Sequence, residues 1–151
     1  MLRTHVAIVA FFILLFLPHI SSKFIFVIVA LAATYLPDID TGFSTLGKSG
    51  VGTVTQFFTR HRGVLHSFSF CIPISLLFAW FIPVLALPFF LGYSLHIFSD
   101  SFTKDGVRPF WPMKFESKWH FRTGGLTEST SFIILLVMDL IAFILVAPNI
   151  F

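Results

Sequence analysis

The stretch VLALPFFLGYSLHIFSDSF, residues 84–102, decides the class of this protein. It is almost entirely apolar, and its length approaches the ~20 residues that a helix needs to cross a bilayer. Its one His and one acidic residue, His96 and Asp100, are four residues apart near its end, so a helix would project both from one face. The stretch therefore predicts a membrane helix that carries two polar side chains near one membrane surface.

The composition of the whole chain agrees with this prediction. Hydrophobic residues make up 56% of the 151 positions, charged residues make up 11%, and Phe alone occupies 22 positions. Soluble domains carry roughly 25% charged residues, and a soluble fold of this length could not bury so much apolar surface. We therefore expect residues 1–151 to form a single integral membrane domain.

Five apolar runs along the chain predict an all-α, polytopic membrane bundle of about five helices. The runs are residues 5–17, 24–36, 64–82, 84–102 and 132–147. The last three approach or reach the length of a membrane span, whereas the first two would extend only ~20 Å as helices. We expect the first two to form short, tilted spans or a re-entrant hairpin, and both arrangements return the chain to its starting side.

Basic residues are concentrated on one predicted side of this bundle. Nine of the ten Lys and Arg residues lie near the N-terminus or in residues 37–63 and 103–127, and only Lys23 lies on the other side. The positive-inside rule then predicts a cytoplasmic N-terminus and an external C-terminus. Because these charges are divided among apolar runs, they indicate membrane topology and not a nucleic-acid partner.

His and Asp side chains gather on the same predicted side. Three neighbouring helix ends carry Asp38, Asp40, His61, His66, His96 and Asp100. Each of these residues alone could end a helix or form a structural hydrogen bond, but together they match the ligands of Zn²⁺, Mn²⁺ or Fe. The sequence therefore predicts a metal site, with His5 and Glu128 as two further candidate ligands. Asp139 lies too deep to join it, and indicates either a separate role or a hydrogen bond to a neighbouring helix.

Four motifs in this chain occur in an order and spacing that resemble a known family. They are Leu36-Pro37-Asp38-Ile39-Asp40; His61-Arg62-Gly63 with His66-Ser67; Leu91-Gly92-Tyr93 with His96 and Asp100; and Thr103, Gly106-Val107 and Trp111-Pro112. Residues from about 5 to 128 resemble the YdjM-like family of LexA-regulated, inner-membrane, metal-dependent hydrolases, which often has Thr where this chain has Leu65. The resemblance implies a bacterial or archaeal inner (cytoplasmic) membrane protein. The family is remotely similar to the zinc-dependent phospholipase C and nuclease superfamily, which implies two or three ions, Zn²⁺ or Mn²⁺, and a phosphoester substrate.

A metal site at headgroup level favours a membrane lipid or a polyprenyl phosphate as the substrate. A bound ion would lower the pKa of a water molecule to about 7 and so produce a nucleophile. We expect Asp38 or Asp40 to act as the general base and Arg62 to hold phosphate oxygens. The further candidates for headgroup binding are Lys104, Arg108 and Arg122.

Two other classes of function would use the same ligands. A metal-ion or proton-coupled transporter usually binds its cargo near the bilayer midplane, within repeats, whereas these candidates lie at helix ends and no repeat is visible. A non-catalytic membrane protein with a structural metal would use a closed, four-coordinate site, for which six to eight candidate ligands are too many. The sequence leaves open the substrate, the identity and number of ions, and the oligomeric state.

Overall fold

The computed structural model describes residues 2–38, 64–119 and 124–150, and most of them are helical. The α-helices are α1 (Leu2–Phe16), α2 (Lys23–Tyr35), α5 (Phe68–Phe81), α6 (Pro83–Ser101) and α7 (Leu126–Ile150). Short 3-10 helices occupy η1 (Leu17–His19), η2 (Leu36–Asp38) and η3 (Val64–His66). The loop after α6 contains an isolated antiparallel bridge between Val107 and Ser117. The predicted all-α bundle of apolar helices is confirmed.

The lengths of the helices correct two details of the prediction. Among the described residues, three segments are long and apolar enough to cross a membrane: Leu2–His19, Pro83–Ser101 and Leu126–Pro148. The first segment is longer than expected because α1 begins at Leu2 and η1 extends it. The run at 64–82 gives a shorter helix than expected, since η3 forms separately and the 14-residue α5 begins only after Ser67.

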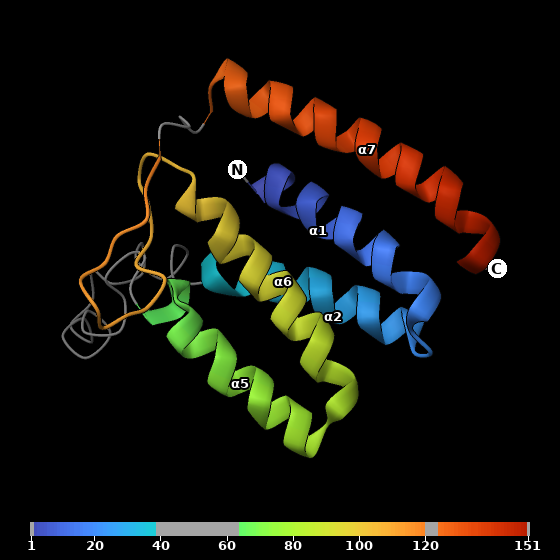
Figure 1. Cartoon of the computed structure of the whole chain (residues 1–151), viewed down its shortest axis with the longest axis horizontal. Helices are drawn as coiled ribbons and strands as arrows, with labels where there is room; N and C mark the ends of the chain where they lie inside the picture. Colours follow the sequence, from blue (N-terminus) through green and yellow to red (C-terminus); the bar gives the residue numbers. More distant parts are fainter. Residues whose placement is uncertain (1, 39–63, 120–123, 151) are drawn as a thin grey trace, which may run out of the picture.

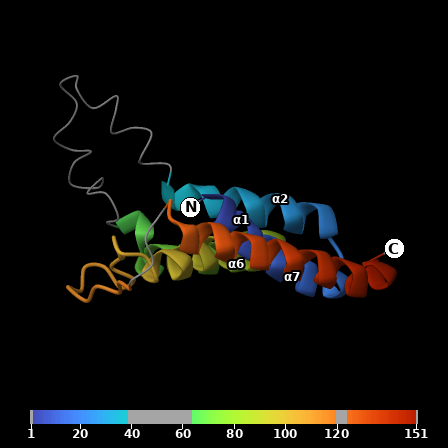
Figure 2. The same cartoon turned by 90° about the horizontal axis from the view of Figure 1, so that it is seen from above.

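The helices are arranged around α6. Helix α6 contacts α2, α5 and α1, while α7 packs against α1 on the outside of the bundle. The starts of α1, α5 and α7 and the ends of α2 and α6 gather at one end of the molecule, and the C-terminus lies at the other (Figures 1 and 2). This arrangement brings the predicted ligand-bearing helix ends together.

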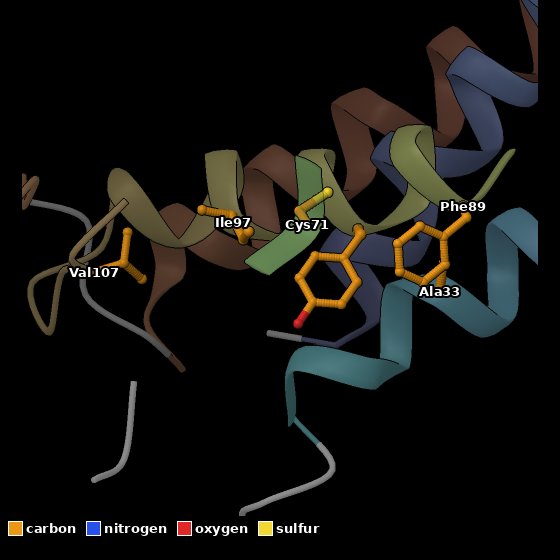
Figure 3. Close-up of a cluster of buried hydrophobic side chains, with 6 residues drawn as sticks. Ala33, Cys71, Phe89, Ile97 and Val107 are labelled. Carbon is orange, nitrogen blue, oxygen red and sulfur yellow. The ribbon is translucent and has the colours of Figure 1, made fainter. Parts of the chain in front are cut away.

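Two apolar clusters fix the position of α6. One joins α6 to α2, α5 and the loop after α6, and its buried members are Ala33, Cys71, Phe89, Tyr93, Ile97 and Val107 (Figure 3). The other joins α6 to α1 and α2, and its buried members are Val9, Ile13, Phe26, Ala30 and Leu91. Because α6 is packed on both sides, its last turns have a fixed position relative to α1, α2 and α5.

Gly92 allows α2 and α6 to approach each other closely. A Cβ atom at Gly92 would overlap the carbonyl group of Ala30. The same carbonyl oxygen accepts a hydrogen bond from the Thr34 hydroxyl at 2.8 Å. Small residues commonly permit such close contacts between membrane helices. This contact, one turn before His96, sets the distance between two of the elements that lead into the site.

Candidate metal centre

Five of the predicted ligands meet where the helix ends gather. They are His5 of α1, Asp38 of η2, His66 of η3, and His96 and Asp100 of α6. His5 and His96 are buried, at 3% and 0% exposure, and His66 and Asp100 are buried as well. Only Asp38 is substantially accessible, with a side chain that is 41% exposed. The cluster is therefore a nearly buried set of metal-binding groups with one accessible carboxylate.

The distances within this cluster fit a metal ion. His5 Nε2 lies 2.9 Å from Asp100 Oδ1, and His66 Nε2 lies 3.3 Å from Asp38 Oδ1. His96 Nε2 lies 3.7 Å from Asp38 Oδ1 and 3.7 Å from Asp100 Oδ2. Ligand atoms about 2.1 Å from a tetrahedral ion are about 3.4 Å apart. The observed separations lie on both sides of this value, so small side-chain movements would suffice to bind an ion.

The ligands form two overlapping groups of three. His5, His96 and Asp100 form one, Asp38, His66 and His96 form the other, and the ligand atoms of each group lie within 4.8 Å of one another. Asp100 connects the groups, because Oδ1 faces His5 while Oδ2 lies 3.9 Å from His66 Nε2 and 3.7 Å from His96 Nε2. Asp100 therefore contacts candidate ligands of both groups, which share His96.

His96 gives the clearest structural reason to expect an ion. Both of its ring nitrogens are buried and lack a hydrogen-bond partner among the described residues. Most buried polar atoms have such a partner, and leaving one unpaired costs about 1–3 kcal/mol. A metal ion on Nε2 would satisfy one of these nitrogens, so the residues present fit the predicted group.

Asp38 is suited to bind a cation at neutral pH. Its pKa is lowered, mainly by the hydrogen bond it accepts from His66, and the nearby imidazoles of His96 and His5 act in the same direction. Partial burial opposes the shift without reversing it. Asp38 is therefore a carboxylate at pH 7, which is the form that coordinates metal.

Two hydrogen bonds fix the backbone beside the ligands. The Tyr93 hydroxyl donates a hydrogen bond at 2.6 Å to the carbonyl of Leu65, the residue immediately before His66. The Thr103 hydroxyl donates a hydrogen bond at 2.8 Å to the backbone carbonyl of Asp100. Neither Tyr93 nor Thr103 was among the predicted site residues, although both belong to the motifs quoted above. In the sequence, the one feature that could have identified these two residues was a polar side chain next to an apolar run.

The structure places the other predicted site residues outside this cluster or does not describe them. Lys104 is exposed on the loop after α6. Arg108 binds Glu116 through Nη2 at 2.8 Å and Nε at 3.1 Å, and this contact lowers the pKa of Glu116. The positions outside the described residues are Asp40, His61, Arg62 and Arg122.

Glu128 is close to the N-terminal part of α1 but not to the other ligands. Its Oε1 accepts a hydrogen bond from Thr4 at 3.4 Å, and its Oε2 accepts one from the backbone N–H of Gly124 at 2.6 Å. Neither group of three candidate ligands includes it. Glu128 therefore contacts α1 at the residue before His5, outside the two candidate groups.

We expect Glu128→Gln to weaken metal binding without changing the number of bound ions. Residues that act through a ligand typically contribute 10–100-fold to metal affinity, and this remote contact should contribute about tenfold or less. Isothermal titration with Zn²⁺ would give both quantities, and Glu116→Gln, an exposed glutamate elsewhere, is the matched control. Loss of a whole ion in Glu128→Gln alone would instead identify Glu128 as a ligand.

The fold and the cluster define the class of this protein as a helical membrane bundle with a candidate metal centre at one end. The model of the YdjM inner membrane protein family matches residues 1–149, so the chain belongs to that family. The family expected from the four motifs is thus confirmed. No curated protein and no solved structure matches the chain.

Proposed function

We propose that this protein is a membrane-embedded, metal-dependent hydrolase that cleaves a phosphoester of a membrane lipid or polyprenyl phosphate at the cytoplasmic face. The observation that carries the proposal is His96, whose two buried ring nitrogens lack partners among the described residues while carboxylates and imidazoles surround it. Each group contains three candidate ligands, with His96 common to both. Catalytic zinc sites typically use three protein ligands and leave a position open, whereas structural sites use four.

Zn²⁺ suits this donor set best, and Mn²⁺ is the second choice, since both accept imidazole and carboxylate. We propose that His5, Asp38, His66, His96 and Asp100 would hold two ions, with Asp40 and His61 as candidate ligands for a third. The bound ions would supply an activated water molecule and neutralise charge on the phosphate. This chemistry would be of the kind used by the zinc-dependent phospholipase C and nuclease superfamily.

The accessible residues of the chain have complementary roles in this proposal. Asp38 is the one partly exposed carboxylate of the described cluster, so it can accept a proton at the edge facing the substrate. Arg62 is proposed to bind the non-bridging phosphate oxygens. Lys104 is better placed than Arg108 to meet a headgroup, because Arg108 already binds Glu116.

Apolar side chains beside the cluster favour a lipid substrate. The loop after α6 begins close to Asp100 and exposes large apolar side chains at Phe102, Phe110, Met113, Phe115 and Trp119. Side chains of this kind commonly lie at the membrane interface. A site next to them would meet lipid headgroups before soluble metabolites.

The charged and aromatic residues at the two ends of the bundle support the proposed orientation of the protein in the membrane. The end that carries the cluster also carries the N-terminus and the basic loop after α6, which the positive-inside rule assigns to the cytoplasm. The opposite end has Lys23 and strongly exposed aromatic residues, with Phe24 at 78%, Trp80 at 82% and Phe81 at 72% exposure. Aromatic residues at both ends are typical of a protein whose helices extend from one interface to the other.

Elemental analysis followed by an activity screen tests the proposal. We expect the purified protein in nanodiscs to release product from lipid phosphates, to lose this activity with a chelator, and to regain it with Zn²⁺ or Mn²⁺. His96→Ala should be inactive and metal-poor, whereas His19→Ala, which removes an exposed histidine at the other end, should behave like the wild type. Metal uptake into proteoliposomes without hydrolysis would contradict the proposal and favour a transporter.

A further inference from the structure

Tyr93 joins helix α6 directly to the short segment that carries His66. The residue is 0% exposed, and its hydroxyl donates a hydrogen bond at 2.6 Å to the backbone carbonyl of Leu65. Leu65 is the central residue of η3, and His66 is its last. Residues 93, 96 and 100 are three and four apart in α6, so Tyr93 shares a helical face with His96 and Asp100. One face of α6 therefore carries two candidate ligands and also holds the segment that supplies a third.

Aromatic neighbours fix the position of the Tyr93 ring. Its centroid lies 5.4 Å from that of Phe89 and 5.9 Å from that of Phe70. Phe89 lies one turn before Tyr93 on α6, and Phe70 belongs to α5. Because closely packed rings keep one orientation, the hydroxyl is directed at Leu65. Removing the hydroxyl would be costly at this position, since the Leu65 carbonyl would lose this partner.

His66 belongs to one of the two groups of candidate ligands. It shares that group with Asp38 and His96, and its Nε2 atom lies 3.3 Å from Asp38 Oδ1. The other group consists of His5 from α1 and of His96 and Asp100 from α6. A shift of η3 would therefore change the first group and leave the members of the second in place.

We propose that Tyr93 is a positioning residue, which places His66 and thereby controls the binding of an ion by the group of Asp38, His66 and His96. This role rests on the metal centre of the proposed function, and not on the bond that the protein cleaves. The Tyr93 hydroxyl contacts the backbone before His66, so Tyr93 acts through His66 and is not itself a ligand. Residues that orient a metal ligand commonly contribute about 10–100-fold to metal affinity.

Zinc titration of the metal-free protein in nanodiscs tests this role. Tyr93→Phe keeps the ring and removes the hydroxyl. We expect it to weaken about tenfold the binding step that His66→Ala removes, and to leave unchanged the step that His5→Ala removes. In a His66→Ala background, Tyr93→Phe should have no effect on zinc binding, whereas a general loss of packing would still reduce it. The matched control is Ser75→Ala, which removes a buried hydroxyl bonded to the Cys71 carbonyl at 2.8 Å and should change neither step.

Several results would overturn the role of Tyr93. They are an unchanged zinc affinity in Tyr93→Phe, an equal weakening of both binding steps, or a single step that is lost in both His66→Ala and His5→Ala. Thermal unfolding of the metal-free variant is the accompanying measurement, and loss of the fold in Tyr93→Phe would assign the hydroxyl to the whole bundle and not to His66. A wild type that binds no zinc would overturn the metal centre as well. Two zinc-binding steps without hydrolysis of any lipid phosphate would contradict the proposed function and leave the role of Tyr93 standing.

Discussion

Replacing Asp100 with asparagine should remove bound metal from the protein. Asp100 has one oxygen 2.9 Å from His5 Nε2 and the other 3.7 Å from His96 Nε2, so its negative charge acts on both groups of ligands. Asparagine keeps the shape of the side chain but loses this charge. We expect metal affinity to fall by at least about a hundredfold, the upper end of the loss seen for residues that act only indirectly. Elemental analysis after dialysis would measure it.

The matched control for this substitution is Asp105→Asn. Asp105 is an exposed carboxylate on the loop that follows α6, so its loss should leave the metal content unchanged. Stoichiometric metal in Asp100→Asn would show that Asp100 is not a ligand. Equal loss in both variants would show that the metal is held by the general negative charge of this end and not by the cluster.

Thermal unfolding distinguishes a lost ligand from a misfolded protein. An ion that binds only the folded state stabilises it by about 2.7 kcal/mol at a free concentration of one hundred times its dissociation constant. The wild type should therefore gain stability on addition of Zn²⁺, and Asp100→Asn should not. Without metal, the variant should be less stable than the wild type, because it removes one partner of the buried His5–Asp100 pair. The test therefore compares the stability that Zn²⁺ adds to each protein.

The amino-acid sequence predicted the membrane class and most members of the candidate cluster for clear physical reasons. Apolar runs report burial in lipid directly, and the four-residue spacing of His96 and Asp100 places both on one helical face. His5 could be predicted as a member because the start of the first run must lie at the same end as the close of the fourth. The five described candidate ligands come from four separate elements. Because the chain reverses direction from one helix to the next, these elements lie at the same end of the bundle.

The remaining features depend on packing, which has no periodic signal in a sequence. Glu128 was predicted as a ligand because it starts the last run, but α7 packs outside α1, so its carboxylate contacts Thr4 instead. Val64 continues an apolar run, yet it belongs to η3, which places His66 in the cluster before α5 begins. In both cases the direction in which a helix end faces, and not its composition, determines which residue reaches the centre.

Substituting Gly92 with alanine should disrupt both the fold and the metal centre. The added Cβ would overlap the backbone carbonyl of Ala30, and backbone cannot move aside as a flexible side chain can. Overpacking typically costs about 1–3 kcal/mol, and we expect the upper part of that range. Because α2 leads into Asp38 while α6 carries His96 and Asp100, moving these helices apart would also separate the ligands.

Thermal unfolding and zinc titration of Gly92→Ala would measure both effects, and Val84→Ile is the matched control. That control also adds one carbon to α6, but at a position that is 41% exposed, so its stability should change by less than about 0.5 kcal/mol. A Gly92→Ala protein that retains wild-type stability and zinc affinity would show that α2 and α6 can move apart without cost. The close contact would then be incidental. A joint loss would show that the distance between these two helices, fixed by one glycine, controls how well the ligands meet.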